Sequence, residues 1–207
     1  MKKESGKKTS LLRLSEQKAQ LVLLRHAPTA GGLRLCGRTD APADLSAAPI
    51  TDARSALEGI TQIVRSPALR CAQTAEALWP DASIAQDARL WEQDFGDHDG
   101  MLYADLPDLG PMTNAQLAAY TPPNGESFTS LCARVHPALN ELAAVAQKAQ
   151  SPVAIVAHAG VIRAAIASTM QQHSEALAFE VDTLSCTRLR VGPTGAFSVI
   201  EVNKTWG

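Results

Sequence analysis

The hydrophobic pattern of the chain has two periods that alternate along the sequence. Short runs of consecutive apolar residues occur at 21–24 and 153–157, and residues 60–64, of which three are apolar, are a third candidate strand. Strands that are buried on both faces of a sheet have this composition, and parallel strands are the usual case. Near the C-terminus, 183–191 and 196–202 flank the turn sequence GPTG, which predicts a hairpin of antiparallel strands at an edge of the sheet.

Between these runs, the spacing of apolar residues predicts helices. Residues 47–59 have helical composition, and a second helix is expected over 66–78, with Ser66 as its N-cap. From Ser127 onward, apolar residues recur three and four positions apart over about five turns, which predicts a long amphipathic helix that Pro137 should kink.

Strands that alternate with helices in this way indicate an α/β fold. We expect a three-layer α/β/α sandwich with a mostly parallel central sheet and an antiparallel edge. Residues 99–125 are rich in proline and polar breaks, so we expect them to form a small cap insertion outside the sheet. The predicted organisation is a basic, flexible tail at residues 1–19 and one domain at 20–207.

Composition and charge narrow the function classes. The chain has 207 residues, of which 45% are apolar, so it can bury a sizeable core. Its net charge is −2; the first 20 residues are basic and the rest is acidic, which argues against a nucleic-acid partner. No apolar run approaches the length of a membrane span, and no signal peptide is apparent. We therefore expect a cytoplasmic protein without membrane contact.

Reactive side chains follow each of the predicted parallel strands. Arg25 and His26 end the first strand, Arg70 follows the second within the next helix, and His158 ends the third. Because the carboxyl ends of parallel strands meet at one edge of the sheet, these groups are expected to converge there. Glu92 lies between two aromatic residues, a setting that can desolvate a carboxyl group and suit it to general acid catalysis.

This set of groups suits phosphoryl transfer. A neutral imidazole can attack phosphorus, while two arginines and a second, protonated histidine stabilise the charge on the phosphoryl oxygens. Neither a metal ion nor another cofactor is required by this set. The Gly-rich loop at 30–45 leaves the first strand above the same edge and is expected to line the pocket, although a solvated surface loop is the alternative.

Four segments, in this order, resemble the histidine phosphatase superfamily, also called the phosphoglycerate mutase-like family. They are LLRHAPT, SPALRCAQTA, LWEQDFGDHDG and VAHAGVIRA. The resemblance implies that His26 becomes phosphohistidine, that Arg25, Arg70 and His158 hold the phosphoryl oxygens, and that Glu92 protonates the leaving oxygen and then activates water. It further implies substrate-binding roles for five residues, which are Thr29, Gly37, Arg38, Ala159 and Gly160.

Within the superfamily, the segments CGRTDAP and PPNGESF are similar to those of the α-ribazole phosphatase type. The predicted function is metal-independent hydrolysis of a small phosphorylated metabolite, with the oligomeric state left open. Two alternatives remain. One is mutase-type phosphoryl transfer, although Gly32 stands where the mutases usually have Asn. The other is a phospho-ligand binding module with little turnover, which would need neither a nucleophile nor a proton donor.

Overall fold

A computed structural model describes residues 19–206 of the chain. The predicted tail at 1–19 therefore lies outside the described residues, except for its last position. The strands are β1 (Gln20–Arg25), β2 (Gln62–Arg65), β3 (Ile84–Gln86), β4 (Val153–Ala157), β5 (Cys186–Val191) and β6 (Phe197–Lys204). The α-helices are α2 (Ile50–Ala56), α3 (Leu69–Leu78), α4 (Asn114–Ala119), α5 (Phe128–Ala149) and α6 (Ala159–Ala167). Short 3-10 helices are η1 (Ala88–Leu90), η2 (Gly96–His98), η3 (Tyr103–Asp105) and η4 (His173–Ala178).

The six strands form one sheet in the order β3-β2-β4-β1-β5-β6. β1, β2, β3 and β4 run parallel, whereas β5 is antiparallel to β1 and β6 is antiparallel to β5. The prediction of a mostly parallel sheet with an antiparallel edge is therefore confirmed. Because β1 and β4 are adjacent and parallel, their last residues, Arg25 and Ala157, are register partners.

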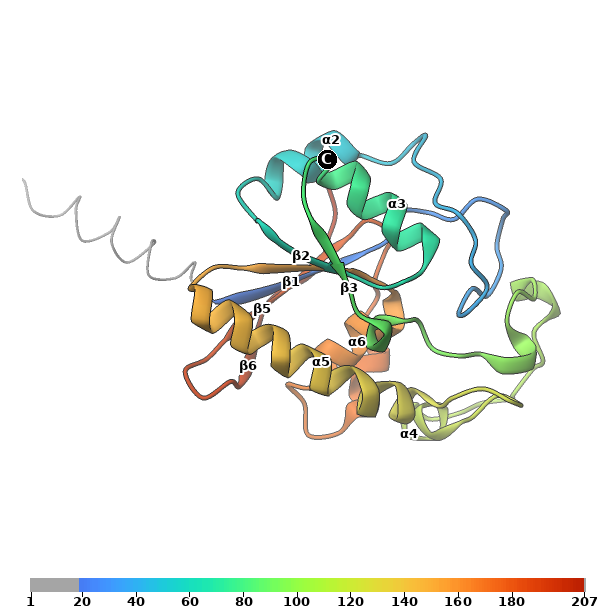
Figure 1. The fold of residues 1–207 in the computed structure, drawn as a ribbon. Coiled ribbons are helices and arrows are strands. Elements are labelled where there is room, and N and C mark those ends of the chain that lie inside the picture. The colour runs from blue at the N-terminus through green and yellow to red at the C-terminus, as the bar shows by residue number, and fades with distance from the viewer. Residues whose placement is uncertain (1–18, 207) are drawn as a thin grey trace, which may run out of the picture.

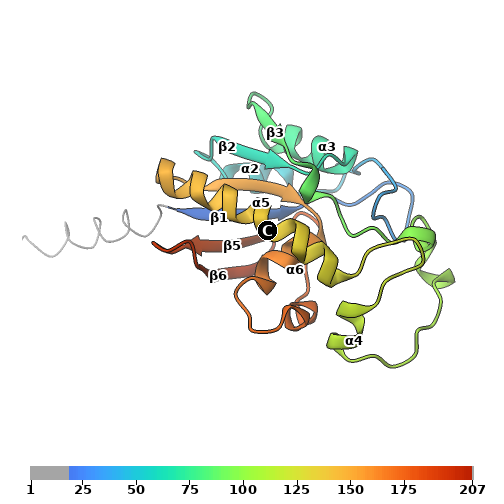
Figure 2. The same cartoon turned by 60° about the horizontal axis from the view of Figure 1, so that its bottom comes forward.

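Helices cover both faces of this sheet, as Figures 1 and 2 show: α2 and α3 lie on one face and α5 and α6 on the other. Successive side chains of β1 point to opposite faces of the sheet. Leu21 and Leu23 belong to the core beneath α5 and α6, whereas Val22 and Leu24 belong to the core beneath α2 and α3. The consecutive apolar run thus buries both sides of a central strand and makes three layers.

The ends of the helices differ in part from the sequence prediction. α5 begins as expected, because the hydroxyl of Ser127 accepts a hydrogen bond from the backbone N–H of Ser130 at 3.1 Å. The prediction that Ser66 caps α3 is wrong. That helix begins at Leu69 with Ala68 as its N-cap, and the Ser66 hydroxyl instead bonds to a buried histidine ring at the end of β4.

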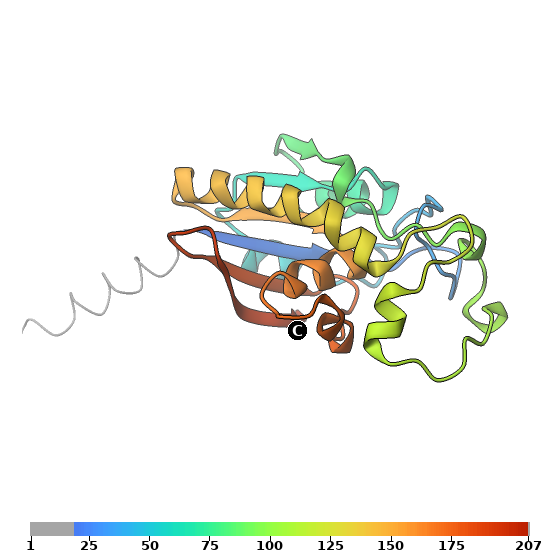
Figure 3. The ribbon, with the colours of Figure 1, turned by 90° about the horizontal axis from the view of Figure 1, so that it is seen from below.

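Residues 99–125, the expected cap insertion, lie beyond the carboxyl ends of the parallel strands. Figure 3 shows this segment, which includes η3 and α4, projecting away from the sheet layers. Its start is tied to the loop that follows β1, because Tyr103 donates its backbone N–H to Leu33 O at 3.0 Å. The segment and the loop thus form two walls at the sheet edge where the reactive groups are expected. That residues 20–207 form one domain stays a prediction.

Candidate active site

The carboxyl ends of β1 and β4, together with α3, bring two histidines and an arginine together. The rings of His26 and His158 lie edge to face, with 5.2 Å between their centroids. Arg70 lies between them: its Nε donates to Nε2 of His26 at 3.3 Å, and its Nη2 donates to Nδ1 of His158 at 3.2 Å. All three are buried. The structure therefore assembles three of the predicted groups at one point.

His26 is held in the tautomer that a nucleophile requires. Its Nδ1–H donates to the backbone carbonyl of Ala27 at 2.6 Å, so Nε2 carries the lone pair. Burial, and secondly the nearby Arg70, lower the pKa of His26 from 6.5 to about 3. The imidazole is therefore neutral at physiological pH, and the Nε2 lone pair, which accepts the hydrogen bond from Arg70, is the one that can act as a nucleophile.

His158 has the complementary arrangement. Its Nε2–H donates to the Ser66 hydroxyl at 2.8 Å, and its Nδ1 accepts from Arg70. Burial, and then the charge of Arg70, hold the pKa of this ring well below its usual value. The expectation that the second histidine is protonated is therefore wrong for this arrangement. A phosphoryl dianion beside Nδ1 would favour the protonated ring, because an opposite charge nearby stabilises it.

Three backbone carbonyls of the loop after β1 fix the guanidinium of Arg70. Its Nη1 donates to Thr39 O at 3.0 Å, and its Nη2 donates to Gly37 O at 2.9 Å and Cys36 O at 3.1 Å. The same loop is held from the other side by Asp99, whose carboxylate accepts the backbone N–H groups of residues 37–39 at 2.7–2.8 Å. Arg70 is thus positioned through a loop that the Asp99 carboxylate helps to order.

Asp99 was not among the predicted site residues. The sequence places it 29 residues after Arg70 and 60 or more after the loop that it binds, in a turn that follows η2. Its only signal is its place in the segment LWEQDFGDHDG, which resembles the family's acid/base segment. Nothing in that pattern says that its carboxylate faces the loop.

Arg25 keeps one donor unpaired within the described part of the protein. Its Nη1 donates to Val181 O at 2.6 Å, whereas its buried Nε has no hydrogen-bond partner among the described residues. A buried guanidinium N–H without a partner is costly, since its desolvation is not compensated. Arg25 also lines the cavity, which fits the phosphoryl-holding role that the resemblance implies.

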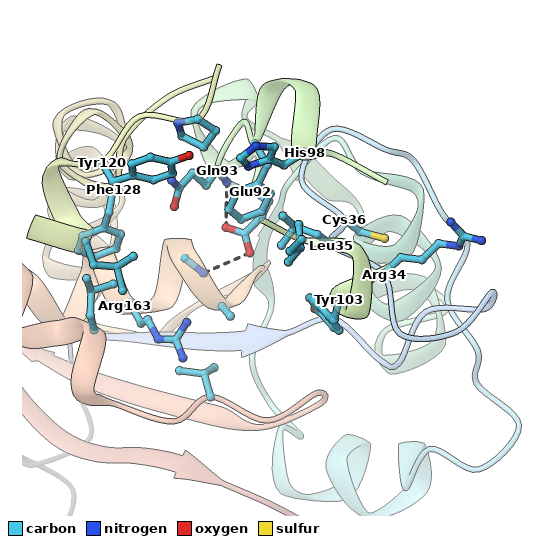
Figure 4. Close-up of a pocket in the computed structure, with 18 of the residues that line it drawn as sticks. Arg34, Leu35, Cys36, Glu92, Gln93, His98, Tyr103, Tyr120, Phe128 and Arg163 are labelled. Atoms are coloured by element: carbon cyan, nitrogen blue, oxygen red, sulfur yellow. Dashed lines mark hydrogen bonds between the residues drawn. The ribbon is translucent and has the colours of Figure 1, made fainter. Parts of the chain in front are cut away.

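Glu92 lies at the N-terminus of α6. Its Oε2 accepts the backbone N–H of Gly160 at 3.2 Å, and its Oε1 accepts that of Gln93 at 2.9 Å. Figure 4 shows the carboxylate pointing into the cavity, with the bond to Gly160 drawn as a dashed line. Gly160 permits this approach, because a Cβ built there would lie 2.3 Å from Oε1 of Glu92. The side chain is buried, yet it lines the cavity, as a proton donor must.

The predicted substrate-binding residues differ in their positions relative to the cavity. Thr29, Ala159 and Gly160 line the cavity. Gly37 contributes through its carbonyl to Arg70. The side chain of Arg38 is not brought to the cavity: its guanidinium lies over the Trp91 ring, 5.3 Å from the centroid, and its Nε is 3.7 Å from a carboxylate oxygen of Asp94.

The cavity extends from His26 into the space under the expected cap and has a volume of about 530 Å³. Its far walls are mostly apolar and aromatic, whereas Arg163 is a cation on the α6 side (Figure 4). The apolar and aromatic lining residues are Leu35, Phe95, Tyr103, Leu106, Pro107, Leu109, Leu117, Tyr120, Pro122, Phe128 and Leu177. The space is much larger than a phosphoryl group and can hold a sizeable leaving group.

Residues 19–206 lack both a membrane-spanning helix and a cluster of metal-ligating side chains. No helix of this part of the chain is long and apolar enough to cross a membrane. Nor do its His, Cys, Asp and Glu side chains form a group of three or more that could hold a metal ion.

Comparison with known proteins places the whole described sheet in one family. The profile of the histidine phosphatase superfamily (branch 1) matches residues 21–205. The structure of a mycobacterial glucosyl-3-phosphoglycerate phosphatase in complex with VO3 is similar, with 28% identity, a TM-score of 0.77, and coverage of 90% of this chain and 100% of that chain. No curated protein matches the sequence.

Two other solved structures share the fold. Bacillus stearothermophilus YhfR has 25% identity and a TM-score of 0.77, and the match covers 91% of this chain and 98% of that one. A candidate alpha-ribazole-5'-P phosphatase from Escherichia coli K-12 has 22% identity and a TM-score of 0.74, with 92% and 99% covered. At 22% identity the second likeness concerns the fold alone.

Proposed function

Because the chain belongs to branch 1 of the histidine phosphatase superfamily, we propose that it is a phosphomonoesterase that acts on a small phosphorylated metabolite through a phosphohistidine on His26. The observation that carries this proposal is the state of the His26 ring. Its Nδ1–H is fixed on a backbone carbonyl, and its neutral Nε2, which accepts a hydrogen bond from Arg70, carries the lone pair of a ring that lines the cavity. A structural histidine needs neither feature.

The reaction follows from the positions of the groups. Nε2 of His26 attacks phosphorus, and the bond from phosphorus to the leaving oxygen breaks in line with it. Arg70, together with Arg25, which lines the cavity, stabilises the negative charge on the phosphoryl oxygens. His158 contributes a further donor once the phosphoryl dianion favours its protonated form.

Glu92 moves the protons in both half-reactions. As a carboxylic acid it gives its proton to the leaving oxygen, which departs as an alcohol. As a carboxylate it then takes a proton from water, whose oxygen attacks the phosphorus of phosphohistidine and releases inorganic phosphate and neutral His26. The hydrogen bonds from Gly160 and Gln93 hold its two oxygens at the cavity.

The comparisons support a phosphatase more than its alternatives. The mycobacterial neighbour is named as a phosphatase, and it has been solved both with VO3 and with inorganic phosphate. The name of the mycobacterial neighbour points to one class of substrate, a phosphoglycerate derivative. Mutase-type transfer and ligand binding without turnover are the alternatives, and no contact in the site favours either.

The test is hydrolysis of 4-nitrophenyl phosphate by the purified chain, followed as released nitrophenolate and as inorganic phosphate. We expect multiple turnovers that survive EDTA, and a loss of about 10³-fold or more in His26→Ala, since the phosphoryl acceptor is gone. Tight binding of phosphate esters with no turnover at any pH would favour the binding module. Complete loss of activity on chelation would contradict the proposed mechanism.

A further inference from the structure

Arg163 is a second cation in the cavity that the phosphoryl chemistry does not use. It lies on α6 three positions after Gly160, so the two residues share one face of the helix. Figure 4 shows its guanidinium in the cavity below Glu92. Arg163 therefore shares one cavity with Glu92 and with residues of the expected cap.

The guanidinium of Arg163 is fixed at one atom and open at the others. Its Nε donates to the backbone carbonyl of Phe179 at 2.9 Å, which orients the planar group. Its two terminal nitrogens have no hydrogen-bond or salt-bridge partner among the described residues. The side chain is half-buried, so its charge is screened less than that of a surface arginine.

Neither of the two nearby carboxylates, those of Glu180 and Asp182, forms an ion pair with Arg163. Glu180 and Asp182 also line the cavity, but both side chains are exposed, and the carboxylate of Asp182 accepts a hydrogen bond from Asn203 at 2.9 Å. On the other side, Arg25 is close enough for the two arginines to repel each other. Two partly desolvated cations along one cavity form a site that favours two anionic groups.

We propose that Arg163 is a subsite for a second anionic group, such as a carboxylate, on the leaving group of the phosphomonoester. The inference rests on the proposed function for the identity of the first anion, which is the phosphoryl group. The aromatic walls formed by Tyr103, Tyr120 and Phe128 suit a sizeable, partly apolar body between the two anions. Arg163 then selects the substrate and takes no part in breaking the phosphorus–oxygen bond.

The test compares esters that differ only in this charge. The probes are 3- and 4-carboxyphenyl phosphate, each paired with its neutral carbamoyl analogue. The enzymes are the wild type, Arg163→Met, Arg163→Lys and Arg190→Met. Arg190 is an exposed arginine on β5. Its backbone register partner is Gln20, the first residue of β1, so it lies at the end of the sheet away from the cavity. Arg190→Met therefore removes one positive charge without touching the cavity.

We expect Arg163→Met to lower kcat/KM about tenfold or more for at least one carboxylated ester, the range of a charge-assisted hydrogen bond, with most of the change in KM. The carbamoyl esters should change less than twofold. Arg163→Lys should restore part of the preference, and Arg190→Met should leave it unchanged. Equal losses for charged and neutral esters would mean that Arg163 only supports the structure and would overturn the inference, as would no loss for any ester.

A second measurement separates this inference from the proposed function. In the His26→Ala background, which cannot form phosphohistidine, the four esters are titrated calorimetrically with and without Arg163→Met. A weaker Kd for the carboxylated esters alone supports the subsite even if the enzyme hydrolyses none of them. Unchanged Kd values overturn it even if the enzyme hydrolyses all of them.

Discussion

Gly160→Ala tests whether the close approach of Glu92 to α6 matters for protonating the leaving group. A Cβ at position 160 would lie 2.3 Å from Oε1 of Glu92 and 2.9 Å from Cδ2 of Leu131, whereas ordinary contact begins near 3.4 Å. The carboxylate must therefore retreat by about 1 Å, and its hydrogen bond from the backbone N–H of residue 160 weakens. A misplacement of about 1 Å can cost about 10²-fold in rate.

Two esters with different leaving groups show whether the loss of rate arises from protonation of the leaving oxygen. We expect kcat/KM for phenyl phosphate to fall about 10²-fold, because phenolate needs the proton that Glu92 supplies. For 4-nitrophenyl phosphate the fall should be smaller, since nitrophenolate leaves without a proton. Combining Gly160→Ala with Glu92→Gln should add little to Glu92→Gln alone, because both changes remove one function.

The matched control is Gly192→Ala, in the turn between β5 and β6, where the nearest atom to a new Cβ is Ala196 O at 3.1 Å and the catalytic groups are distant. It should keep full activity on both esters. Thermal unfolding shows whether each variant is folded at the assay temperature. A folded Gly160→Ala enzyme with wild-type kcat/KM on phenyl phosphate, or with equal losses on both esters, would refute the reasoning.

Two further predictions concern the charges around the site. Burial and Arg70 lower the pKa of His26 from 6.5 to about 3. Between these two pH values the unfolded chain therefore binds more protons than the folded one. The free energy of unfolding is not reduced by this group above about pH 6.5, and it falls as the pH is lowered toward 3. Between pH 7 and 4, the Tm should decline less steeply with falling pH in His26→Asn than in the wild type. Equal slopes of Tm against pH would contradict the lowered pKa of His26. Asp99→Asn should lower kcat/KM about tenfold by loosening the loop that holds Arg70, since a hydrogen bond to a charged group is worth about 1.5–3 kcal/mol. The exposed Asp105→Asn is its control, and an unchanged rate for Asp99→Asn would show that the loop is held without this carboxylate.

The main features of the fold and the convergence of the reactive groups follow from local patterns. Apolar runs mark β1 and β4, and the rule that parallel strands share a carboxyl edge brings Arg25, His26 and His158 together. Helical spacing likewise predicts α5, which begins directly after Ser127. In each case a few neighbouring residues carry the information.

What the sequence does not reveal depends on contacts between distant segments. Ser66 fits the composition of a helix N-cap, but its hydroxyl satisfies His158 on another strand. The neutral state of His158 follows from complete burial beside Arg70, which no local pattern reports. The role of Asp99 requires knowing that two loops about 60 residues apart in sequence meet, and the orientation of Arg38 depends on the same packing.

The central claim is that His26 carries the phosphoryl group during the reaction. The most direct measurement is a rapid quench of the enzyme with ³²P-labelled substrate, followed by peptide mapping of the labelled protein. We predict an acid-labile, base-stable label on the peptide that contains His26, formed and discharged at rates that account for turnover, and absent from His26→Ala. Turnover with no labelled enzyme, or a label on any other residue, would contradict the mechanism.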